Sequence, residues 1–287
     1  MRVLSWNILN GGADGGDVRR WQVQAGLIRE LEPDVLLLQE ARGFSADGGA
    51  RLFAAEADLG MRGLLAVAPH TGQHTAVFLR PPLRPVRFEP DPVHFHHALA
   101  LASVEVPGLA APIQLASMHL SPLSPALRAG EVGWLAALAA PGALSLLAGD
   151  ANSLAPGDPE PDDWPDLPAF QRVRYLTQPG PDGAGSSQRP AADRSAVGFL
   201  HAAGLVDAAA GDTGVDATPT VPTRGYPQAE FVAFRSDHVL LSPALAPART
   251  SYRVVQDERA HATSDHLPVL VELDLGRLAT AAAAGDR

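Results

Sequence analysis

Six short polar clusters punctuate a chain that is otherwise rich in apolar runs. They are Trp6-Asn7, Gln39-Glu40, Met118-His119-Leu120, Gly149-Asp150-Ala151-Asn152, Arg235-Ser236-Asp237-His238 and Ser264-Asp265-His266. Most of them follow an apolar run that we predict to be a buried strand, and the Arg235 cluster leads into one. Burying carboxylates and imidazoles is costly unless they are paired, hydrogen-bonded or bound to metal. Strand ends are also the usual place for sites in α/β proteins, so the clusters predict one polar site.

The side chains in these clusters favour one kind of chemistry. They offer carboxylates, amides and imidazoles, and the chain has no cysteine. Hard oxygen ligands suit Mg²⁺ or Mn²⁺ better than zinc or copper. An activated water attacking a phosphate that is held by such a cation is the usual hydrolytic arrangement. We therefore expect metal-assisted chemistry on a phosphoester.

Composition excludes several other classes. All 22 basic residues are arginine, so a lysine nucleophile, a Schiff base and a P-loop lysine are impossible. The absence of cysteine excludes a disulfide scaffold, a thiolate zinc site and a cysteine nucleophile. The net charge of −10 argues against a protein that coats nucleic acid without specificity. It still permits an enzyme that engages a few phosphates through a bound cation.

The chain shows no pattern of a targeting segment or a membrane span. Met1 and Arg2 lead directly into a short apolar run, without a signal-peptide cleavage pattern. The longest apolar stretches, such as residues 134–140, are far shorter than the roughly 20 residues that a membrane span needs. We therefore expect a cytoplasmic protein with no membrane span and no evident protein partner.

Apolar periodicity predicts strands that alternate with helices. The predicted strands cover residues 3–8, 35–38, 75–79, 98–106, 113–119, 144–148, 239–241, 252–255 and 269–273. The predicted helices cover residues 17–32, 50–59, 125–140 and 195–203. Trp21 and Trp134 each fall on the apolar face of a predicted helix and are expected in the core. This alternation is typical of an α/β sandwich.

Two segments stand apart from this pattern. Residues 155–190 are rich in Pro, Gly and Asp and are predicted to form a long loop insertion, with a short helix near 170–176. Residues 278–287 form an Ala-rich tail. We expect residues 1–277 to be a single catalytic domain.

The ordered set of clusters resembles the endonuclease/exonuclease/phosphatase superfamily, whose fold is that of deoxyribonuclease I. The resemblance runs from residue 5 to residue 268 and follows the family's order. Its most specific pair is Gly149-Asp150-Ala151-Asn152 together with Ser264-Asp265-His266-Leu267-Pro268. The resemblance implies a four-layered α/β/β/α sandwich of two mixed sheets flanked by helices. It also implies a metal-dependent phosphoesterase with Mg²⁺ or Mn²⁺ as cofactor.

The resemblance implies a role for each matching residue. Glu40 would be the main metal-binding carboxylate, and Asn7 and Asp265 would complete or orient the metal site. Asp150 and Asn152 would position the attacking water and a phosphate oxygen.

His266 would act as general base or transition-state stabiliser, with its tautomer held by Asp237. His119 would contact the phosphate or help the leaving group. The chain departs from the family pattern at Ser236, where an aliphatic residue is usual, and it offers no clear acidic partner for His119 upstream.

Other polar and aromatic residues are weaker candidates. His74 falls near an inner strand where the family often places a polar residue. Arg42 and Arg235, with Arg172 and Arg174, could form a local basic rim for substrate. Trp164, in the long loop, could stack on a base, although packing the loop is an equal alternative. His94 and His96 could share a strand face as metal ligands, but an ordinary structural role is favoured, and His97 would lie on the other face.

The favoured function is a phosphodiesterase or nuclease, because His119 and His266 give two imidazoles as in deoxyribonuclease-type members. Its partner would be a phosphoester substrate, with DNA and RNA among the choices. The alternatives are a phosphatase or phosphodiesterase acting on a small-molecule or lipid phosphoester, and a non-catalytic binding protein that retains the fold.

Overall fold

The computed structural model describes residues 1–162, 164, 167–177, 191–211, 214–230 and 232–278. Two six-stranded sheets form the centre of the molecule. The first sheet has the order β13 (Arg249–Val254), β14 (Val269–Leu273), β1 (Arg2–Asn7), β2 (Val35–Gln39), β4 (Thr75–Leu79) and β3 (Arg62–Ala66). The second has the order β5 (Arg84–Asp91), β6 (Leu99–Glu105), β7 (Ile113–His119), β8 (Ser145–Asp150), β12 (Asp237–Leu241) and β9 (Val206–Asp207). A short ribbon pairs β10 (Ala210–Gly211) with β11 (Gly214–Val215).

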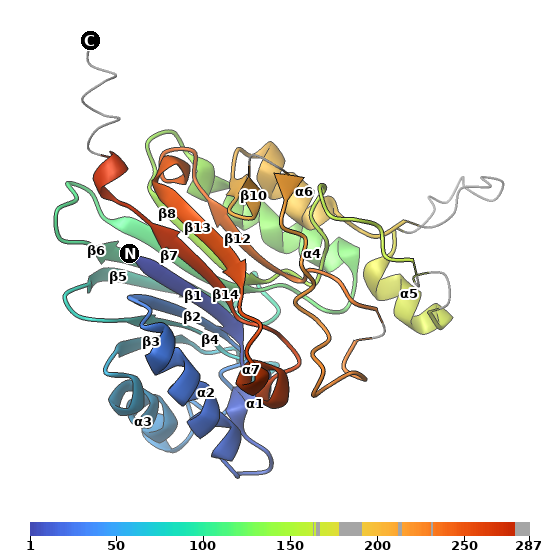
Figure 1. Ribbon diagram of the computed structural model, residues 1–287, viewed down its shortest axis with the longest axis horizontal. Helices are drawn as coiled ribbons and strands as arrows, with labels where there is room; N and C mark the ends of the chain where they lie inside the picture. Colours follow the sequence, from blue (N-terminus) through green and yellow to red (C-terminus); the bar gives the residue numbers. More distant parts are fainter. Residues whose placement is uncertain (163, 165–166, 178–190, 212–213, 231, 279–287) are drawn as a thin grey trace.

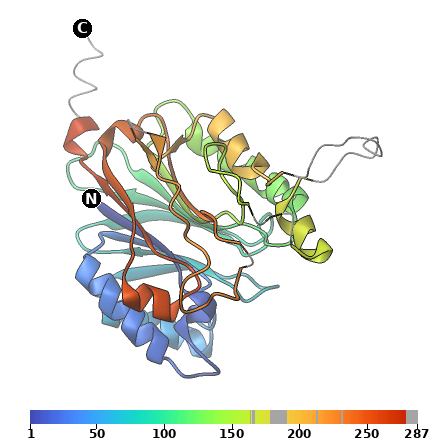
Figure 2. The same ribbon diagram turned by 45° about the vertical axis from the view of Figure 1, so that its right-hand side comes forward.

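Helices cover the outer face of each sheet (Figures 1 and 2). On the first sheet lie α2 (Arg19–Leu31) and α3 (Ala50–Leu59), and on the second lie α4 (Pro125–Val132) and α6 (Ser195–Ala202). The shorter helices are α1 (Leu9–Gly12), α5 (Ala169–Tyr175) and α7 (Glu258–Thr263). Short 3₁₀ helices span Asp47–Gly49, Gly133–Ala139 and Ala246–Ala248.

Three apolar layers hold this sandwich together, because each central strand is apolar on both faces. On β2, Val35 and Leu37 point between the sheets, while Leu36 and Leu38 pack beneath the helices of the first sheet. A third layer joins the second sheet to α4 and α6. The predicted four-layered α/β/β/α architecture of two mixed sheets is confirmed.

Each sheet contains one parallel pair near its middle, and the other main-sheet pairings are antiparallel. In the first sheet β1 runs parallel to β2, which places Asn7 beside Gln39. In the second sheet β7 runs parallel to β8, which places His119 beside Asp150. The carboxyl ends of parallel strands meet at one edge of a sheet, so both sheets deliver polar residues to the same end of the sandwich.

The structure differs from the sequence prediction in several elements. Strands β3 and β5 were not predicted, and β5 is a largely exposed strand at the edge of its sheet. The helix predicted over residues 125–140 ends at Val132 and continues as 3₁₀ structure. The change in helical period turns Trp134 outward, where it is 59% exposed, so its predicted place in the core is wrong. Trp21 is buried as expected.

The described part of the long loop packs on its own small core. Its buried residues include Trp164, Leu167 and Tyr175, which lie against Val221 and Phe234. Helix α5 matches the short helix predicted there. Residues 178–190 and most of the predicted tail lie outside the described residues.

Among the described residues, no helix has the length and apolar character of a membrane span.

Candidate active site

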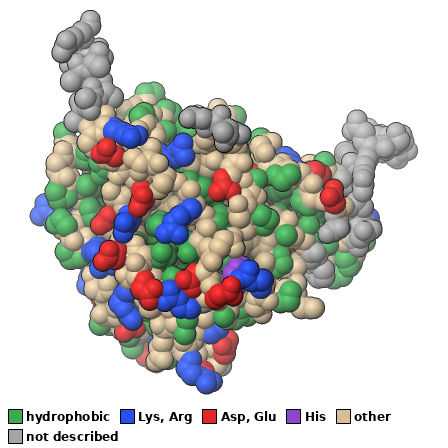
Figure 3. Space-filling model, in the orientation of Figure 1, with side chains coloured by type: hydrophobic (Ala, Val, Ile, Leu, Met, Phe, Trp, Pro, Cys, Tyr) green, Lys and Arg blue, Asp and Glu red, His purple; other side chains and the backbone are tan. Residues whose placement is uncertain are grey.

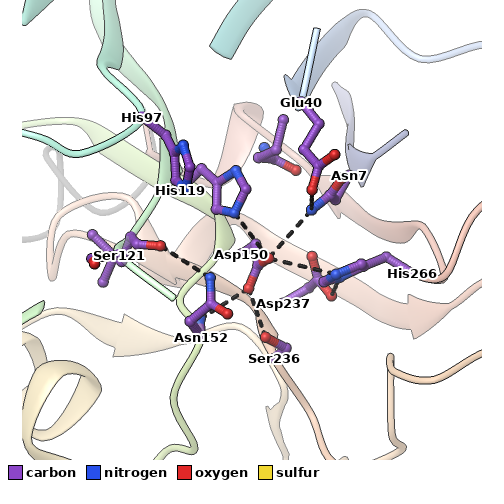
Figure 4. A network of polar contacts seen from close by, with 12 residues as sticks. Asn7, Glu40, His97, His119, Ser121, Asp150, Asn152, Ser236, Asp237 and His266 are labelled. Atoms are coloured by element: carbon purple, nitrogen blue, oxygen red, sulfur yellow. Dashed lines mark hydrogen bonds and ion pairs between the residues drawn. The ribbon is translucent and has the colours of Figure 1, made fainter. Parts of the chain in front are cut away.

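Asp150 lies at the centre of the polar cluster at the strand ends (Figure 4). Its Oδ1 accepts hydrogen bonds from the Ser236 hydroxyl at 2.6 Å and from the Asn152 backbone N–H at 2.9 Å. Its Oδ2 faces the Asn7 amide and His119 Nε2, each at 3.3 Å, and it lies 3.5 Å from His266 Nε2. One carboxylate oxygen is therefore fixed by the protein, while the other is shared by groups from both sheets.

Backbone geometry explains why glycine precedes this aspartate. Gly149 has φ of +143°, and a Cβ there would lie only 1.9 Å from the Met118 carbonyl oxygen. A side chain at this position would separate β8 from β7. Two residues later, Asn152 has a left-handed φ of 49°, and its side-chain amide donates to the Leu120 carbonyl at 3.0 Å. This turn returns the chain beneath the Asp150 carboxylate.

His266 lies between two carboxylates. Its Nδ1 is 2.8 Å from Asp237 Oδ2, and its Nε2 faces Asp150. Burial alone would lower the pKa of His266, but the charges of Asp237 and Asp150 raise it well above the usual value. With a carboxylate facing each ring nitrogen, the doubly protonated, charged form of the imidazole is favoured.

His119 is held differently. Its Nε2 faces Asp150, and its ring stacks on that of His97 with centroids 4.1 Å apart and planes at 27°. Burial, reinforced by the charges of His266 and His96, lowers the pKa of His119 to about 3. The site thus combines one charged and one neutral imidazole on the same carboxylate oxygen.

Glu40 leaves β2 in a left-handed conformation, with φ of 56°, which turns its carboxylate toward the end of β1. The Asn7 amide lies 3.3 Å from Oε1, and the Asn10 backbone N–H donates to Oε2 at 2.8 Å. Burial, with a further contribution from the negative charge of Asp265, raises the pKa of Glu40. Asp265 is half-buried beside this carboxylate.

The residues proposed as metal ligands fit a divalent cation. Glu40 and Asp265 concentrate negative charge, and within the described part of the chain no arginine pairs with either carboxylate. A hard cation would compensate this charge. The Asn7 amide turns its nitrogen toward Glu40 and Asp150, while its Oδ1 accepts the Leu9 backbone N–H at 3.2 Å. Groups of three or more His, Cys, Asp or Glu side chains with metal-binding geometry are not found among the described residues. The two carboxylates are therefore the groups that suit a cation, and the Asn7 amide orients Glu40 beside them.

The structure brings Asn7, Glu40, His119, Asp150, Asn152, Asp237 and His266 together in one cluster, with Asp265 at its edge. His74 does not join them. Its Nε2 contacts the Ser45 hydroxyl at 2.7 Å, and its Nδ1 accepts from the Ala68 backbone N–H at 3.1 Å. Both ring nitrogens are therefore used in holding loops of the first sheet.

Two further expectations about substrate contacts are wrong. Arg235 does not lie on a rim, since its guanidinium is fully buried and pairs with Asp158 and Asp207, each at 2.7 Å. Trp164 is only 2% exposed and packs on Tyr175 and Phe234, so it is a core residue of the loop. Arg42 is exposed, and its guanidinium reaches the Asn10 side chain at 3.3 Å.

Two site residues were missed as candidates. Ser236 looked like a departure from the family pattern, yet its hydroxyl holds Asp150. His97 was set aside because it would lie on the opposite strand face from His94 and His96. In the structure these residues form a turn before β6 and no strand, and the His97 ring meets that of His119. The position of His97 directly before a predicted inner strand was the available signal.

A sandwich of two mixed sheets with carboxylates, amides and imidazoles at its strand ends defines the deoxyribonuclease-I-like class of fold. The model of the endonuclease/exonuclease/phosphatase family matches residues 4–266, and the chain belongs to this family. Enzymes of this family hydrolyse phosphoesters and generally use divalent metals. Comparison with curated proteins finds no match in sequence.

Solved structures share the fold at low sequence identity. A mannosyl-6-phosphatase from Bacteroides thetaiotaomicron is 16% identical with a TM-score of 0.65, covering 95% of this chain and 99% of its own. A humanized TDP2 from D. rerio is 15% identical with a TM-score of 0.60, covering 94% and 97%. An endonuclease/exonuclease/phosphatase from Beutenbergia cavernae is 23% identical with a TM-score of 0.59, covering 95% and 71%. At these identities the likeness shows the fold alone.

Proposed function

We propose that this protein is a phosphodiesterase or nuclease that depends on Mg²⁺ or Mn²⁺, with residues 1–277 as its catalytic domain. One observation carries the proposal: Nε2 of His119 and Nε2 of His266 face the same oxygen of Asp150, at 3.3 and 3.5 Å. Of two imidazoles beside one carboxylate, one can stabilise a phosphoryl oxygen while the other donates a hydrogen bond to the leaving-group oxygen. Hydrolysis of any phosphoester needs this, because the alkoxide leaving group requires stabilisation as well as the phosphoryl oxygens. The choice of a diester rests on the likeness of this imidazole pair to that of deoxyribonuclease-type members.

The raised pKa of His266 favours one of the two roles considered for it. An imidazolium with both nitrogens facing carboxylates carries no free lone pair, so it is a poor general base. We assign it to stabilising negative charge on a phosphoryl oxygen, with Asp237 holding its orientation. Accepting a proton from the attacking water then falls to Asp150, whose other oxygen is held by Ser236 and Asn152.

Neutral His119 completes the arrangement. Its Nε2 faces Asp150, so the ring proton sits on that nitrogen and can be donated as a hydrogen bond toward the leaving-group oxygen. Glu40 and Asp265 would hold the cation, and Asn7 would orient the Glu40 carboxylate. When bound, the cation supplies positive charge to a phosphoryl oxygen. Water attacks phosphorus directly, and no covalent intermediate on the protein is needed.

The charges on one face of the molecule suit a substrate with few phosphates. On the face shown in Figure 3, arginine and acidic side chains are interleaved and do not gather into one basic patch. A small phosphoester, or the end of a nucleic acid strand, needs fewer cationic contacts than a long duplex. The second candidate is therefore a phosphatase or phosphodiesterase for a small-molecule or lipid phosphoester. A non-catalytic binding protein is the third.

A substrate panel tests this proposal. Plasmid DNA, single-stranded DNA, RNA, an aryl phosphodiester and an aryl phosphomonoester would each be offered with Mg²⁺, Mn²⁺ or chelator. We expect chelator-sensitive hydrolysis of diesters that exceeds hydrolysis of the monoester. His119→Ala should reduce diester hydrolysis by about 100-fold. A preference for the monoester that survives this substitution would favour the phosphatase.

A further inference from the structure

A pocket outside the candidate active site is lined on one side by His96. It has a volume of about 500 Å³ and lies between the segment 92–96 and helix α4. Volumes of this size are typical of pockets for small ligands. No role for this pocket follows from the site described above.

Ring contacts connect this pocket to the candidate active site. His96, which lines the pocket, meets His97 edge-on with centroids 4.5 Å apart, and His97 stacks on His119. Glu131 fixes this wall, because its carboxylate accepts the backbone N–H of His96 at 2.7 Å and that of Ser121 at 2.8 Å. Two ring contacts therefore connect the pocket to His119 at the end of β7, and the hydrogen bonds of Glu131 fix the position of His96.

The pocket presents a planar aromatic surface to solvent. The rings of Trp134 and His94 stack at 3.7 Å with planes at 28°. Trp134 is 59% exposed, and Leu127 and Val93 on the rim are 49% and 80% exposed. Large apolar side chains in such numbers beside a pocket are typical of a binding site.

The charges in the pocket favour an uncharged ligand. Among the described residues that line it there is no arginine. His94 is paired with Asp91 at 2.8 Å, and both oxygens of Glu131 already accept backbone N–H groups. Burial, with the charge of His70, lowers the pKa of His96. An anionic phosphate is therefore poorly suited to the pocket, while a flat neutral ring can stack on Trp134.

We propose that this pocket is a subsite for an uncharged planar ring, such as a nucleobase, carried by the phosphoester substrate. The link to a phosphoester rests on the proposed function, whereas the ring-binding pocket itself does not. The inference narrows the substrate to a nucleotide-like phosphoester, or a strand end, whose ring enters the pocket while its phosphate lies at Asp150.

Tryptophan fluorescence gives a direct test, because only one of the four tryptophans faces solvent. Trp6, Trp21 and Trp164 are at most 5% exposed, so a ring stacking in the pocket would quench Trp134 selectively. Adenosine is the probe, and ribose is the control without a base. We expect saturable quenching by adenosine at millimolar concentrations and none by ribose. Octyl glucoside below its micellar concentration tests an acyl chain as the rival ligand.

A matched pair of glycine substitutions makes the test specific. Gly130 lines the pocket on α4, and Gly26 lies on α2, far from it; a Cβ at either position meets nothing within 4 Å. Gly130→Leu fills the pocket and should weaken adenosine quenching at least tenfold, while Gly26→Leu should leave it unchanged. Circular dichroism would check that both variants fold.

Three results would overturn the proposal: no quenching by adenosine, equal quenching in Gly130→Leu, or quenching by octyl glucoside alone. A comparison of adenosine 5′-monophosphate with adenosine in the presence of Mg²⁺ separates this inference from the proposed function. Tighter binding of the monophosphate supports both. Equal binding of the two would contradict the proposed phosphate site at Asp150, while the ring subsite would remain supported.

Discussion

His97 lies flat against His119, with ring centroids 4.1 Å apart, and both rings are buried. His97 lies in the turn before β6, and His119 ends the adjacent strand β7. His97 Nδ1 meets the Thr71 hydroxyl at 3.0 Å. His97 therefore covers one face of the His119 ring. This stacking and the contact with Asp150 together fix the orientation of the His119 imidazole.

His97 should make the folded state sensitive to acid. Burial, with the charges of His119 and His96, lowers its pKa to about 2, whereas the unfolded chain takes up a proton near pH 6.5. Its contribution to stability is therefore complete above about pH 6.5 and is lost as pH falls from there toward 2.

His97→Phe keeps the stacked ring and removes the titration. Between pH 7 and pH 5, the loss in free energy of unfolding should be smaller in this variant by about 2 kcal/mol. Urea unfolding at both pH values measures it, with the exposed His70→Phe as control. Equal pH dependence in wild type and His97→Phe would contradict the buried, neutral state of this ring.

Arg235 should contribute to stability and not to substrate binding. Its guanidinium joins Asp158 in the loop after β8 to Asp207 on β9, and all three side chains are buried. Arg235→Met leaves two carboxylates buried without a partner, which should cost about 3–5 kcal/mol of unfolding free energy. The exposed Arg42→Ala should cost about 0.5 kcal/mol or less. A raised KM with unchanged stability in Arg235→Met would restore the substrate-binding interpretation.

Asp237 should act through the orientation of His266. Asp237→Asn preserves the shape of the side chain but removes the charge that faces Nδ1 of the imidazole. We expect kcat to fall by about 10- to 100-fold while the KM for the phosphodiester changes little. Steady-state kinetics would show this split, with the folded state checked by thermal unfolding. A change confined to KM would mean that Asp237 acts on binding and not through the imidazole.

The site residues that lie at strand ends could be predicted from the sequence. Asn7, Glu40 and Asp150 could be found because each follows an apolar run, and the parallel pairs of the two sheets bring such ends together. The contacts between sheets and loops could not be predicted from the sequence. Arg235 was misjudged because its partners lie 77 and 28 residues away along the chain.

Two other residues were misjudged, each for its own reason. Ser236 holds Asp150 across 86 residues, and no local pattern marks that hydrogen bond. Trp134 was predicted in the core because the α-helical period was assumed to continue beyond Gly133, where the helix changes to 3₁₀ geometry. Local periodicity therefore predicted the layers well, while the partners of individual polar side chains required the folded structure.

Glu40→Gln tests the central claim, that this site performs metal-dependent phosphoester hydrolysis, most directly. Hydrolysis of an aryl phosphodiester would be measured against Mg²⁺ and Mn²⁺ concentration for wild type and variant, with metal binding followed by calorimetry. Because burial already raises the pKa of Glu40, the neutral amide should not destabilise the metal-free fold. We expect metal-dependent turnover in wild type and a loss of at least about 100-fold in the folded variant, together with weaker metal binding. Turnover that survives in Glu40→Gln with unchanged metal dependence would contradict the account.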